Sequence, residues 1–227
     1  MDIFKYSNIG SREVNQDYIV SQSFGQDVSL HLVADGIGGY ECGEIASKVV
    51  GDSFVYGIIR NMSLEESTSL ASANMIKECH NLGVSKMGST VAGILINKSE
   101  ATVFWAGDSR VYIFRNHEVI YQTEDHSLVN ELGKVRPLTF DERKKYGHVI
   151  TRSIMGKADD HVDVYNTTLQ SGDEILICTD GIYNDCPVDY LAESIRTGCF
   201  VIDKQNENFD DIHSLIFITI LDENTMR

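Results

Sequence analysis

The stretch Thr90–Arg115, TVAGILINKSEATVFWAGDSRVYIFR, decides the fold. It contains three apolar runs, Thr90–Asn97, Ala101–Ala106 and Val111–Arg115, whose length and β-branched and aromatic content are typical of buried strands. A tight turn at Lys98–Ser99 joins the first two runs, and the turn GDSR joins the second to the third. Because a parallel crossover needs about a dozen residues, these short connections predict antiparallel hairpins.

Elsewhere in the chain, similar apolar runs predict four more strands: Asp17–Ser23, Ser29–Ala34, Glu174–Thr179 and Leu215–Leu221. Stretches with helical character predict helices over Glu41–Asn61, over Leu64–Leu82, from Ser127 onward, and over Pro187–Arg196. The short turn at Met62–Ser63 predicts that the first two helices form an antiparallel pair on one sheet. Strands and helices occupy separate blocks, so the predicted fold class is α+β, a sandwich in which helices cover sheets.

The composition indicates one compact domain. Of the 227 residues, 42% are hydrophobic, and no repeat, low-complexity tract or Pro-rich linker divides the chain, so we expect a single domain over residues 1–227. We find no apolar run of about 20 residues and no apolar signal-peptide core, so we expect a cytoplasmic protein without a membrane segment or anchor. Five cysteines without a CxxC pair argue against a zinc site or a dithiol site.

The chain is strongly acidic. A formal net charge of −15 argues against nucleic-acid binding, which needs clustered Lys and Arg, and favours cations as partners. Most surface carboxylates only solvate a fold, so position decides which of them have a function. Four segments combine an apolar run with aspartate at a turn: HLVADGIGG with Asp35, FWAGDSR with Asp108, ILICTDGIYN with Asp180, and Asp210–Asp211 before HSLIFITI.

Glycines beside these acids permit sharp turns, so that carboxylates and carbonyls can point at one ligand. Hard oxygen ligands suit magnesium or manganese, whereas zinc prefers His or Cys. A single Asp-Gly pair is a common turn, and many carboxylates in one place repel each other, so the acids are either dispersed or held together by metals. Nucleotide binding at Gly38–Gly43 is disfavoured, because Glu44 and Ile45 stand where a phosphate loop needs lysine and a hydroxyl.

Several motifs occur in an order that resembles a known family. Arg12 with Asn15–Gln16–Asp17 resembles the opening R-x-x-N-E-D, VADGIGG resembles the turn DGMGG or DGHGG, and GSTVAG at Gly88–Gly93 resembles G-[ST]-T-[AV]. WAGDSRVY, DHSLVNEL, ITRSIMG, GDEILICTDGIYN and DIHSLIFI follow in the same order. These motifs span the chain, which therefore resembles the metal-dependent protein phosphatases, also called PPM or type 2C serine/threonine phosphatases, in their compact bacterial form.

The resemblance implies a four-layer αββα sandwich, with two central, mostly antiparallel sheets flanked by helix pairs and the active site at one edge. Residues 125–150 resemble the family's flap, where substrate selection is expected. Five basic residues of the flap either meet acidic or phosphorylated substrates or form a solvated face: Lys134, Arg136, Arg143, Lys144 and Lys145. His126 and Ser127 are expected to cap the helix that they open.

By the same resemblance, the catalytic residues are Arg12, Asp35, Asp180 and Asp211. The implied metal-binding residues are Asp17, Asp35, Gly36 through its carbonyl, Asp108, Asp180 and Asp211. Asp35 would bridge two Mn²⁺ or Mg²⁺ ions in a site that Asp180 and Asp211 complete. Asp17 would act through metal-bound waters, and Asp108 would help to hold a third, weaker ion. Arg12 would bind the substrate phosphate.

Three positions depart from the family pattern. Gln16 replaces the acid of N-E-D, Asn184 stands where TDGxxD has a second aspartate, and Ile212 replaces the asparagine of D-N-x-[ST]. We expect Gln16 to lower metal affinity modestly and Asn184 to weaken or empty the third metal site. We expect Ile212 to leave Asp211 less firmly oriented, so that Asp210 could compete for its role.

The implied activity is hydrolysis of phosphoserine and phosphothreonine in proteins, by in-line attack of a water or hydroxide that bridges the two ions. Ile37 stands where some members carry a histidine acid, so a metal-bound water would protonate the leaving group. The expected partners are phosphorylated proteins and an opposing Ser/Thr kinase, and we expect a monomer. Two alternatives stay open: a catalytically weak or silent phosphoprotein-binding scaffold, and a phosphatase of small phosphoesters.

Overall fold

The computed structural model describes residues 1–37, 42–200 and 211–221. The strands in these ranges are β1 Asp2–Asn8, β2 Asp17–Phe24, β3 Val28–Asp35, β4 Val91–Asn97, β5 Glu100–Ala106, β6 Arg110–Arg115, β7 Glu118–Gln122, β8 Asp163–Thr168, β9 Glu174–Cys178 and β10 His213–Thr219. The helices are α1 Gly43–Ile59, α2 Leu64–Leu82, α3 Leu128–Val135, α4 Phe140–Tyr146, α5 Asp180–Asp185 and α6 Val188–Arg196.

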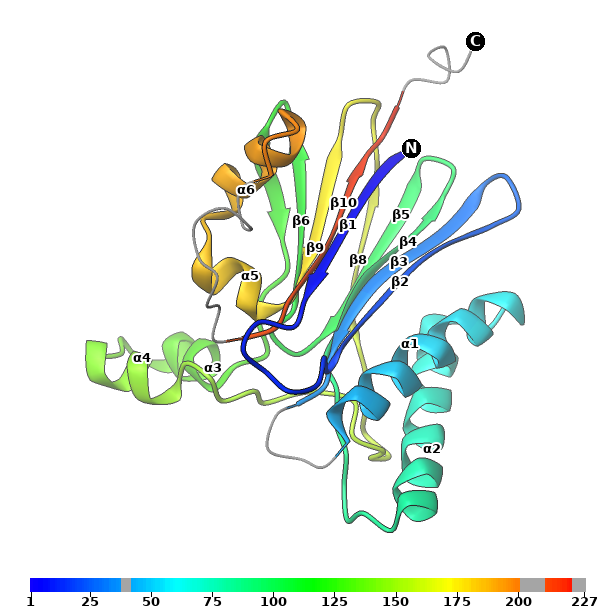
Figure 1. Ribbon diagram of the computed structural model, residues 1–227, viewed down its shortest axis with the longest axis vertical. Coiled ribbons are helices and arrows are strands. Elements are labelled where there is room, and N and C mark those ends of the chain that lie inside the picture. The colour runs from blue at the N-terminus through cyan, green and yellow to red at the C-terminus, as the bar shows by residue number, and fades with distance from the viewer. Residues whose placement is uncertain (38–41, 201–210, 222–227) are drawn as a thin grey trace.

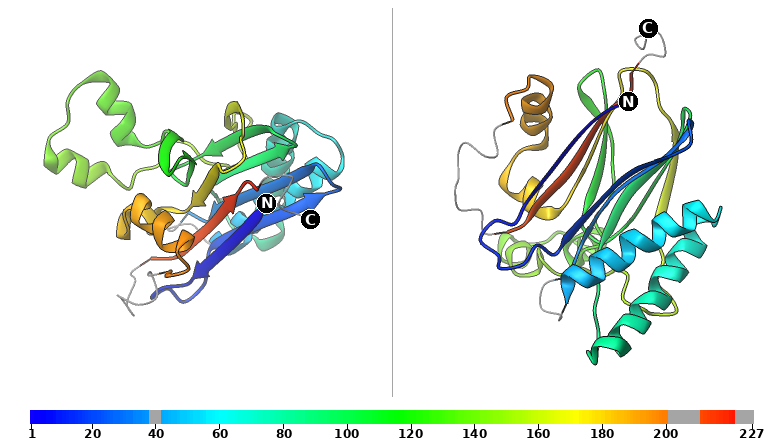
Figure 2. Two further views of the ribbon diagram at one scale, coloured as in Figure 1. Left: turned by 90° about the horizontal axis from the view of Figure 1, so that it is seen from above. Right: turned by 45° about the vertical axis from the view of Figure 1, so that its right-hand side comes forward.

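The strands form two five-stranded sheets, one in the order β1-β10-β9-β6-β7 and the other in the order β2-β3-β4-β5-β8. Every pair of neighbouring strands is antiparallel. The helices α1 and α2 cover the outer face of the β2–β5 sheet, and α5 and α6 lie against the other sheet (Figure 1 and Figure 2). The predicted α+β class and the four-layer αββα sandwich are confirmed.

Three apolar clusters fill the three interfaces between these layers. Between α1–α2 and their sheet, the rings of Phe54 and Phe104 stack with centroids 4.9 Å apart. Between the two sheets lie mainly β-branched residues, among them Ile94, Ile113, Ile177 and Ile216. Between the other sheet and α5–α6 lie Tyr112, Phe114, Leu176, Ile182 and Leu191. Both faces of the central strands are therefore buried, which explains why their sequences are continuous apolar runs rather than alternating ones.

The hairpin predicted at Lys98–Ser99 is confirmed, because Asn97 pairs with Glu100 across that turn. The second predicted hairpin, through GDSR, is wrong: β5 belongs to one sheet and β6 to the other. At this point the chain crosses between the sheets, and Gly107 allows the crossing with φ of +115°. A Cβ at Gly107 would lie 2.7 Å from the Thr90 Cβ, so this position needs glycine for space as well as for conformation.

The predicted pair of long helices is confirmed, with α2 beginning in a capping box of Ser63 and Glu66. Glu41, where the first helix was predicted to start, lies outside the described residues. The strands β1, β7 and β8 and the helices α4 and α5 were not predicted. Each of these three strands lies at the edge of a sheet and is half-buried or exposed along its length, so it lacks the apolar run that marks a central strand.

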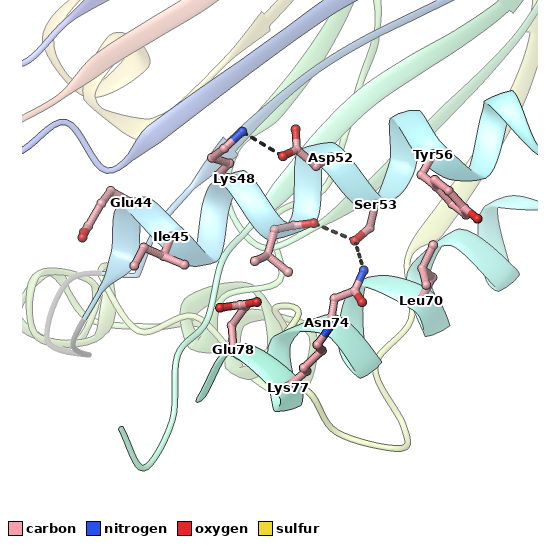
Figure 3. Close-up of a pocket in the computed structure, with 11 residues that line it drawn as sticks. Glu44, Ile45, Lys48, Asp52, Ser53, Tyr56, Leu70, Asn74, Lys77 and Glu78 are labelled. Carbon is pink, nitrogen blue, oxygen red and sulfur yellow. Dashed lines mark hydrogen bonds and ion pairs between the residues drawn. The ribbon is translucent and has the colours of Figure 1, made fainter. Parts of the chain in front are cut away.

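All five cysteines are free thiols, in line with the absence of a CxxC pair. None of the helices in the described part of the chain combines the length and apolar character that a membrane span requires. A groove of about 740 Å³ runs between α1 and α2, with Ile45, Val49 and Leu70 among its apolar lining (Figure 3). Lys48 and Asp52 form an ion pair of 2.8 Å beside it. None of the residues that line this groove was predicted to bind metal or substrate.

His31, on β3, is a fully buried histidine. One ring nitrogen, Nδ1, lies 2.9 Å from the Ser21 hydroxyl and the other, Nε2, lies 3.0 Å from the Ser29 hydroxyl. Burial, and after it the charge of Lys5, lower the pKa of His31 from 6.5 to about 4. Between pH 6.5 and about pH 4, His31 is protonated in the unfolded chain and neutral in the folded chain. The free energy of unfolding therefore decreases as the pH falls through this range.

We therefore expect the unfolding free energy to fall by about 2 kcal/mol more in the natural protein than in His31→Gln when the pH is lowered from 7 to 4.5. Urea denaturation at both pH values measures this difference. The exposed residue His161 provides the control, since His161→Gln should leave the pH dependence unchanged. Parallel pH dependences for the natural protein and His31→Gln would contradict the burial of a neutral histidine.

Candidate metal centre

The structure brings five predicted aspartates together around Asp35. Asp17 and Asp35 face each other across β2 and β3. Asp108 lies at the crossing between the sheets, Asp180 opens α5 after β9, and Asp211 precedes β10. Burial, and then the charges of Asp17, Asp180, Asp108 and Asp211, raise the pKa of Asp35 well above its usual value. Charges act this strongly only over short distances, so the acidic turns converge on one place.

The backbone of Asp35 is held by the motif GST that precedes β4. The Asp35 N–H donates to the Thr90 hydroxyl at 3.1 Å, and the Asp35 carbonyl accepts from the Thr90 N–H at 2.8 Å. The Ser89 hydroxyl also donates to that carbonyl, at 3.0 Å. Thr90 Oγ1 lies 2.8 Å from the hydroxyl of Ser109, which links this motif to the GDSR crossing. Sequence reasoning did not assign Ser89 and Thr90 to the site, although their motif was recognised.

Gly36 has no room for a side chain. Its N–H donates to the carbonyl of Gln16 at 3.0 Å, and a Cβ on Gly36 would lie 2.1 Å from the carbonyl oxygen of Gly43 at the start of α1. The side chain of Gln16 packs against the same turn of α1, since a Cβ on Gly43 would lie 2.7 Å from Gln16 Nε2. Gln16 thus places a neutral side chain against the first turn of α1, where the family motif has an acid.

Two of the acids carry an oxygen that no group within the described residues satisfies. Asp17 Oδ2 accepts from the Thr179 hydroxyl at 2.9 Å, but Asp17 Oδ1 is buried and has no partner among the described residues. Asp108 Oδ1 is buried and equally without a partner in those ranges. Burial, and among the nearby charges that of Asp180, raise the pKa of Asp17 to about 6. The same two causes raise the pKa of Asp108 to about 7.

Asp180 and Asp211 lie next to each other in this arrangement. Burial, and then the charge of Asp211, raise the pKa of Asp180. Gly181 allows the close approach of the two turns, because a Cβ there would lie 2.2 Å from the Ile212 carbonyl oxygen. Asn184 Nδ2 approaches Asp180 Oδ2 at 3.5 Å, so the departure at this position replaces a negative charge with a weak donor.

Asp211 is oriented despite the loss of asparagine at position 212. Its Oδ1 accepts from the backbone N–H of Ile212 at 2.9 Å and lies 3.1 Å from a guanidinium nitrogen of Arg12. The donor from position 212 is thus a backbone N–H, which any residue except proline could supply. Asp210, the alternative ligand, lies outside the described residues.

The flap is joined to the site at its base. Arg110, the last residue of GDSR, makes two hydrogen bonds to Asp125, at 2.8 and 2.7 Å, and its guanidinium carbon lies 3.5 Å from the centroid of the Tyr183 ring. The Tyr183 hydroxyl donates to the Asp108 carbonyl at 2.8 Å. The crossing that carries Asp108 is therefore tied both to the flap and to α5.

Beyond this base, the flap helices α3 and α4 bury none of their residues, and they project from the sandwich in Figure 2. The predicted cap at Ser127 is confirmed, because its hydroxyl accepts from the Asn130 N–H at 3.3 Å. The cap predicted for His126 is wrong: its ring contacts Gly107 and Asp163 instead. Two of the five basic flap residues are paired with acids, Lys134 with Glu124 and Arg136 with Glu142.

The donor set suits a hard cation. Within residues 1–37, 42–200 and 211–221, no three His, Cys, Asp or Glu side chains already form a set of metal ligands, although the charges of four aspartates raise the pKa of Asp35. An ion here would therefore also need backbone oxygen and water, which is the usual coordination of magnesium and manganese. The unsatisfied oxygens of Asp17 and Asp108 fit that requirement, because a buried carboxylate without a partner is costly.

Comparison with known proteins agrees with this site. A sequence model of the family Protein phosphatase 2C matches residues 6–209. The chain is 31% identical to protein phosphatase PhpP of Streptococcus pneumoniae over 224 residues, which cover 90% of this chain and 88% of PhpP. It is 30% identical to a putative protein phosphatase of Mycoplasma genitalium over 207 residues, which cover 81% of this chain and 78% of that protein.

Solved structures show the same fold. The serine/threonine phosphatase of S. agalactiae superposes with a TM-score of 0.77 and 26% identity, over 96% of this chain and 99% of that one. The catalytic domain of the phosphatase PstP, solved with two manganese ions, superposes with a TM-score of 0.80 and 21% identity, over 97% of this chain and 98% of that one. The chain therefore belongs to the protein phosphatase 2C family, the metal-dependent serine/threonine phosphatases that the order of its motifs predicts.

Proposed function

We propose that this chain hydrolyses phosphoserine and phosphothreonine in proteins with the help of two Mn²⁺ or Mg²⁺ ions. One observation carries the proposal: five carboxylates converge around Asp35, and two of them present buried oxygens without a partner among the described residues. Without cations, such a cluster is destabilising, because each charge raises the free energy of the next. A protein that only binds phosphoproteins has no chemical reason to keep it, which favours catalysis over the scaffold alternative.

The core ions would be held by three carboxylates and one carbonyl, those of Asp35, Asp180, Asp211 and Gly36. Asp17 lies behind Asp35 on the neighbouring strand and would bind through water, and Asp108 would hold a third, weaker ion. When bound, the ions would supply Lewis-acid chemistry, lowering the pKa of water and offsetting the negative charge of the phosphoryl group. The structure described for PstP contains two manganese ions, which supports this number of core ions.

Arg12 would bind the substrate phosphate. Its side chain is about half exposed, at 51%, and it lies against Asp211 at the rim of the acidic cluster. A guanidinium offers a planar fork of donors that matches two phosphate oxygens, and it neutralises charge on the phosphoryl group during transfer. We infer that Arg12 exchanges its contact with Asp211 for the phosphate when substrate binds, which would free Asp211 for metal.

The partners follow from the same proposal. We propose phosphorylated proteins as substrates and a Ser/Thr kinase as the opposing enzyme, since the relatives in Listeria are named serine/threonine phosphatases. We propose that residues 1–227 act as one catalytic domain, in the cytoplasm and as a monomer. Three basic flap residues have no acidic partner among the described residues, Arg143, Lys144 and Lys145, and we propose that their positive charge attracts acidic or phosphorylated segments.

Activity should depend on manganese or magnesium and on Asp35. With a phosphothreonine peptide and Mn²⁺, we expect Asp35→Asn to lower kcat by at least about 10³-fold, because a neutral side chain neither bridges cations nor offsets their charge. Chelator should abolish turnover by the natural protein. Asp189→Asn, at an exposed aspartate of α6, is the matched control and should retain full activity. Turnover that persists in chelator would refute the metal mechanism, and faster turnover of a small phosphoester would favour that substrate class.

The same substitution should stabilise the metal-free protein. Asp35→Asn removes one charge from a buried cluster, so we expect its unfolding temperature without metal to rise, by roughly 2–4 °C for each kcal/mol of repulsion relieved. Addition of Mn²⁺ should raise the unfolding temperature of the natural protein and have little effect on the variant. Differential scanning calorimetry measures both changes. An unchanged or lower unfolding temperature for the metal-free variant would show that the acids do not repel one another.

We expect Arg12 to contribute to substrate binding and turnover and not to Mn²⁺ affinity. We expect Arg12→Ala to lower kcat/KM for the phosphopeptide by about 10- to 100-fold, because a charge-assisted, two-pronged contact with phosphate is lost. Mn²⁺ binding, measured by isothermal titration calorimetry, should stay the same or become tighter, since Asp211 loses a competing cation. A variant with weakened Mn²⁺ binding and normal KM would instead place Arg12 in the support of the metal site.

A further inference from the structure

One mostly buried histidine, His126, sits between the flap base and the crossing that carries Asp108. Its side chain is 11% exposed, and its ring stacks parallel to that of Trp105, with centroids 5.9 Å apart. It follows Asp125, which accepts two hydrogen bonds from Arg110, and it precedes Ser127, which caps α3. Neither the predicted metal ligands nor the predicted catalytic residues include it.

His126 satisfies both backbone polar groups of Gly107. Its ring Nδ1 accepts a hydrogen bond from the Gly107 N–H at 3.1 Å, and its own backbone N–H donates to the Gly107 carbonyl at 2.9 Å. Gly107 has φ of +115°, a conformation that other residues rarely adopt. A glycine in this region has many accessible conformations, so these two hydrogen bonds select one of them.

The other ring nitrogen is fixed as well. Because Nδ1 accepts, the proton of the neutral ring is on Nε2, which donates to Asp163 Oδ2 at 3.1 Å. A guanidinium nitrogen of Arg152 also lies 3.0 Å from Nε2. Arg152 forms an ion pair with the second oxygen of Asp163 and so holds that carboxylate in place. The hydrogen bond to Asp163 thus fixes the orientation of the ring, and in this orientation Nδ1 accepts from the Gly107 N–H.

Gly107 is the residue immediately before Asp108, whose Oδ1 has no partner among the described residues. The direction of the Asp108 side chain therefore depends on the backbone around it. Tyr183 holds the Asp108 carbonyl on the far side, and His126 holds the peptide on the near side. We propose that His126 is a positioning residue for Asp108, which sets the affinity of the weaker ion that Asp108 would hold. This inference rests on the proposed metal-dependent function.

The His126 side chain also packs against Trp105 and links the flap base to β8 through Asp163, which is the alternative role to be tested. Two substitutions separate the two roles. In His126→Asn, the side-chain carbonyl falls close to the position of Nδ1 and can still accept from Gly107. In His126→Gln, the longer amide reaches toward the position of Nε2 and can still donate to Asp163, but the acceptor for Gly107 is lost.

The experiment is a Mn²⁺ titration of the full chain, with free Mn²⁺ followed by its electron paramagnetic resonance signal. The natural protein should show two tighter sites and one weaker site. We expect His126→Asn to keep the weaker site within about threefold, and His126→Gln to weaken it by about tenfold, the loss of roughly one hydrogen bond. The tighter sites should be unchanged in both variants, and Asp108→Asn should lose the weaker site.

His161→Asn is the matched control, because His161 is exposed and its ring Nδ1 lies 2.8 Å from the Asp159 carbonyl oxygen. This variant should bind Mn²⁺ like the natural protein. If His126→Gln kept the weaker site and His126→Asn lost it, the role of His126 would lie with Asp163, and the proposal would be wrong. Equal affinities in all variants, or a natural protein with tight sites and no weaker one, would also overturn it. A natural protein that binds no Mn²⁺ tightly would instead overturn the proposed function.

Discussion

The repulsion among buried carboxylates around Asp35 is the constraint on which the rest of the site depends. The charges of Asp17, Asp180, Asp108 and Asp211 all raise the pKa of Asp35, and the charge of Asp180 also raises the pKa values of Asp17 and Asp108. Holding these acids together is therefore unfavourable by itself. The free energy for this comes from elsewhere, chiefly from three apolar interfaces between four layers. The protein thus keeps a locally unfavourable arrangement that a pair of divalent ions would relieve.

The backbone keeps these acids in place more than their side chains do. Ser89 and Thr90 hold both polar groups of the Asp35 backbone, the Ile212 N–H orients Asp211, and Tyr183 holds the carbonyl of Asp108. Backbone contacts leave carboxylate oxygens available for other partners, and Asp108 Oδ1 has none among the described residues. The group that contacts Asp211 at position 212 is a main-chain N–H, which does not depend on the side chain there.

Each of the two sheets contributes two aspartates to the site. Asp17 and Asp35 belong to the β2–β5 sheet, whereas Asp180 and Asp211 flank strands of the other sheet. Asp108 sits on the segment that passes from one sheet to the other, and the same segment contacts the flap through Arg110 and Asp125. The flap base is therefore linked to Asp108 through Arg110, and the same segment reaches Asp35 through Ser109 and Thr90.

Much of this arrangement follows from local patterns. Apolar runs identify the central strands, turn lengths identify the β4–β5 hairpin and the α1–α2 pair, and the order of the acidic motifs identifies the family, because each signal lies within a few neighbouring residues. The edge strands β1, β7 and β8 escaped prediction, because strands with one free edge need no apolar run. Only the tertiary structure decided that GDSR crosses between sheets, that Thr90 supports Asp35, and that His126 contacts Gly107, because these contacts join segments far apart in the chain and leave no periodic signal in it.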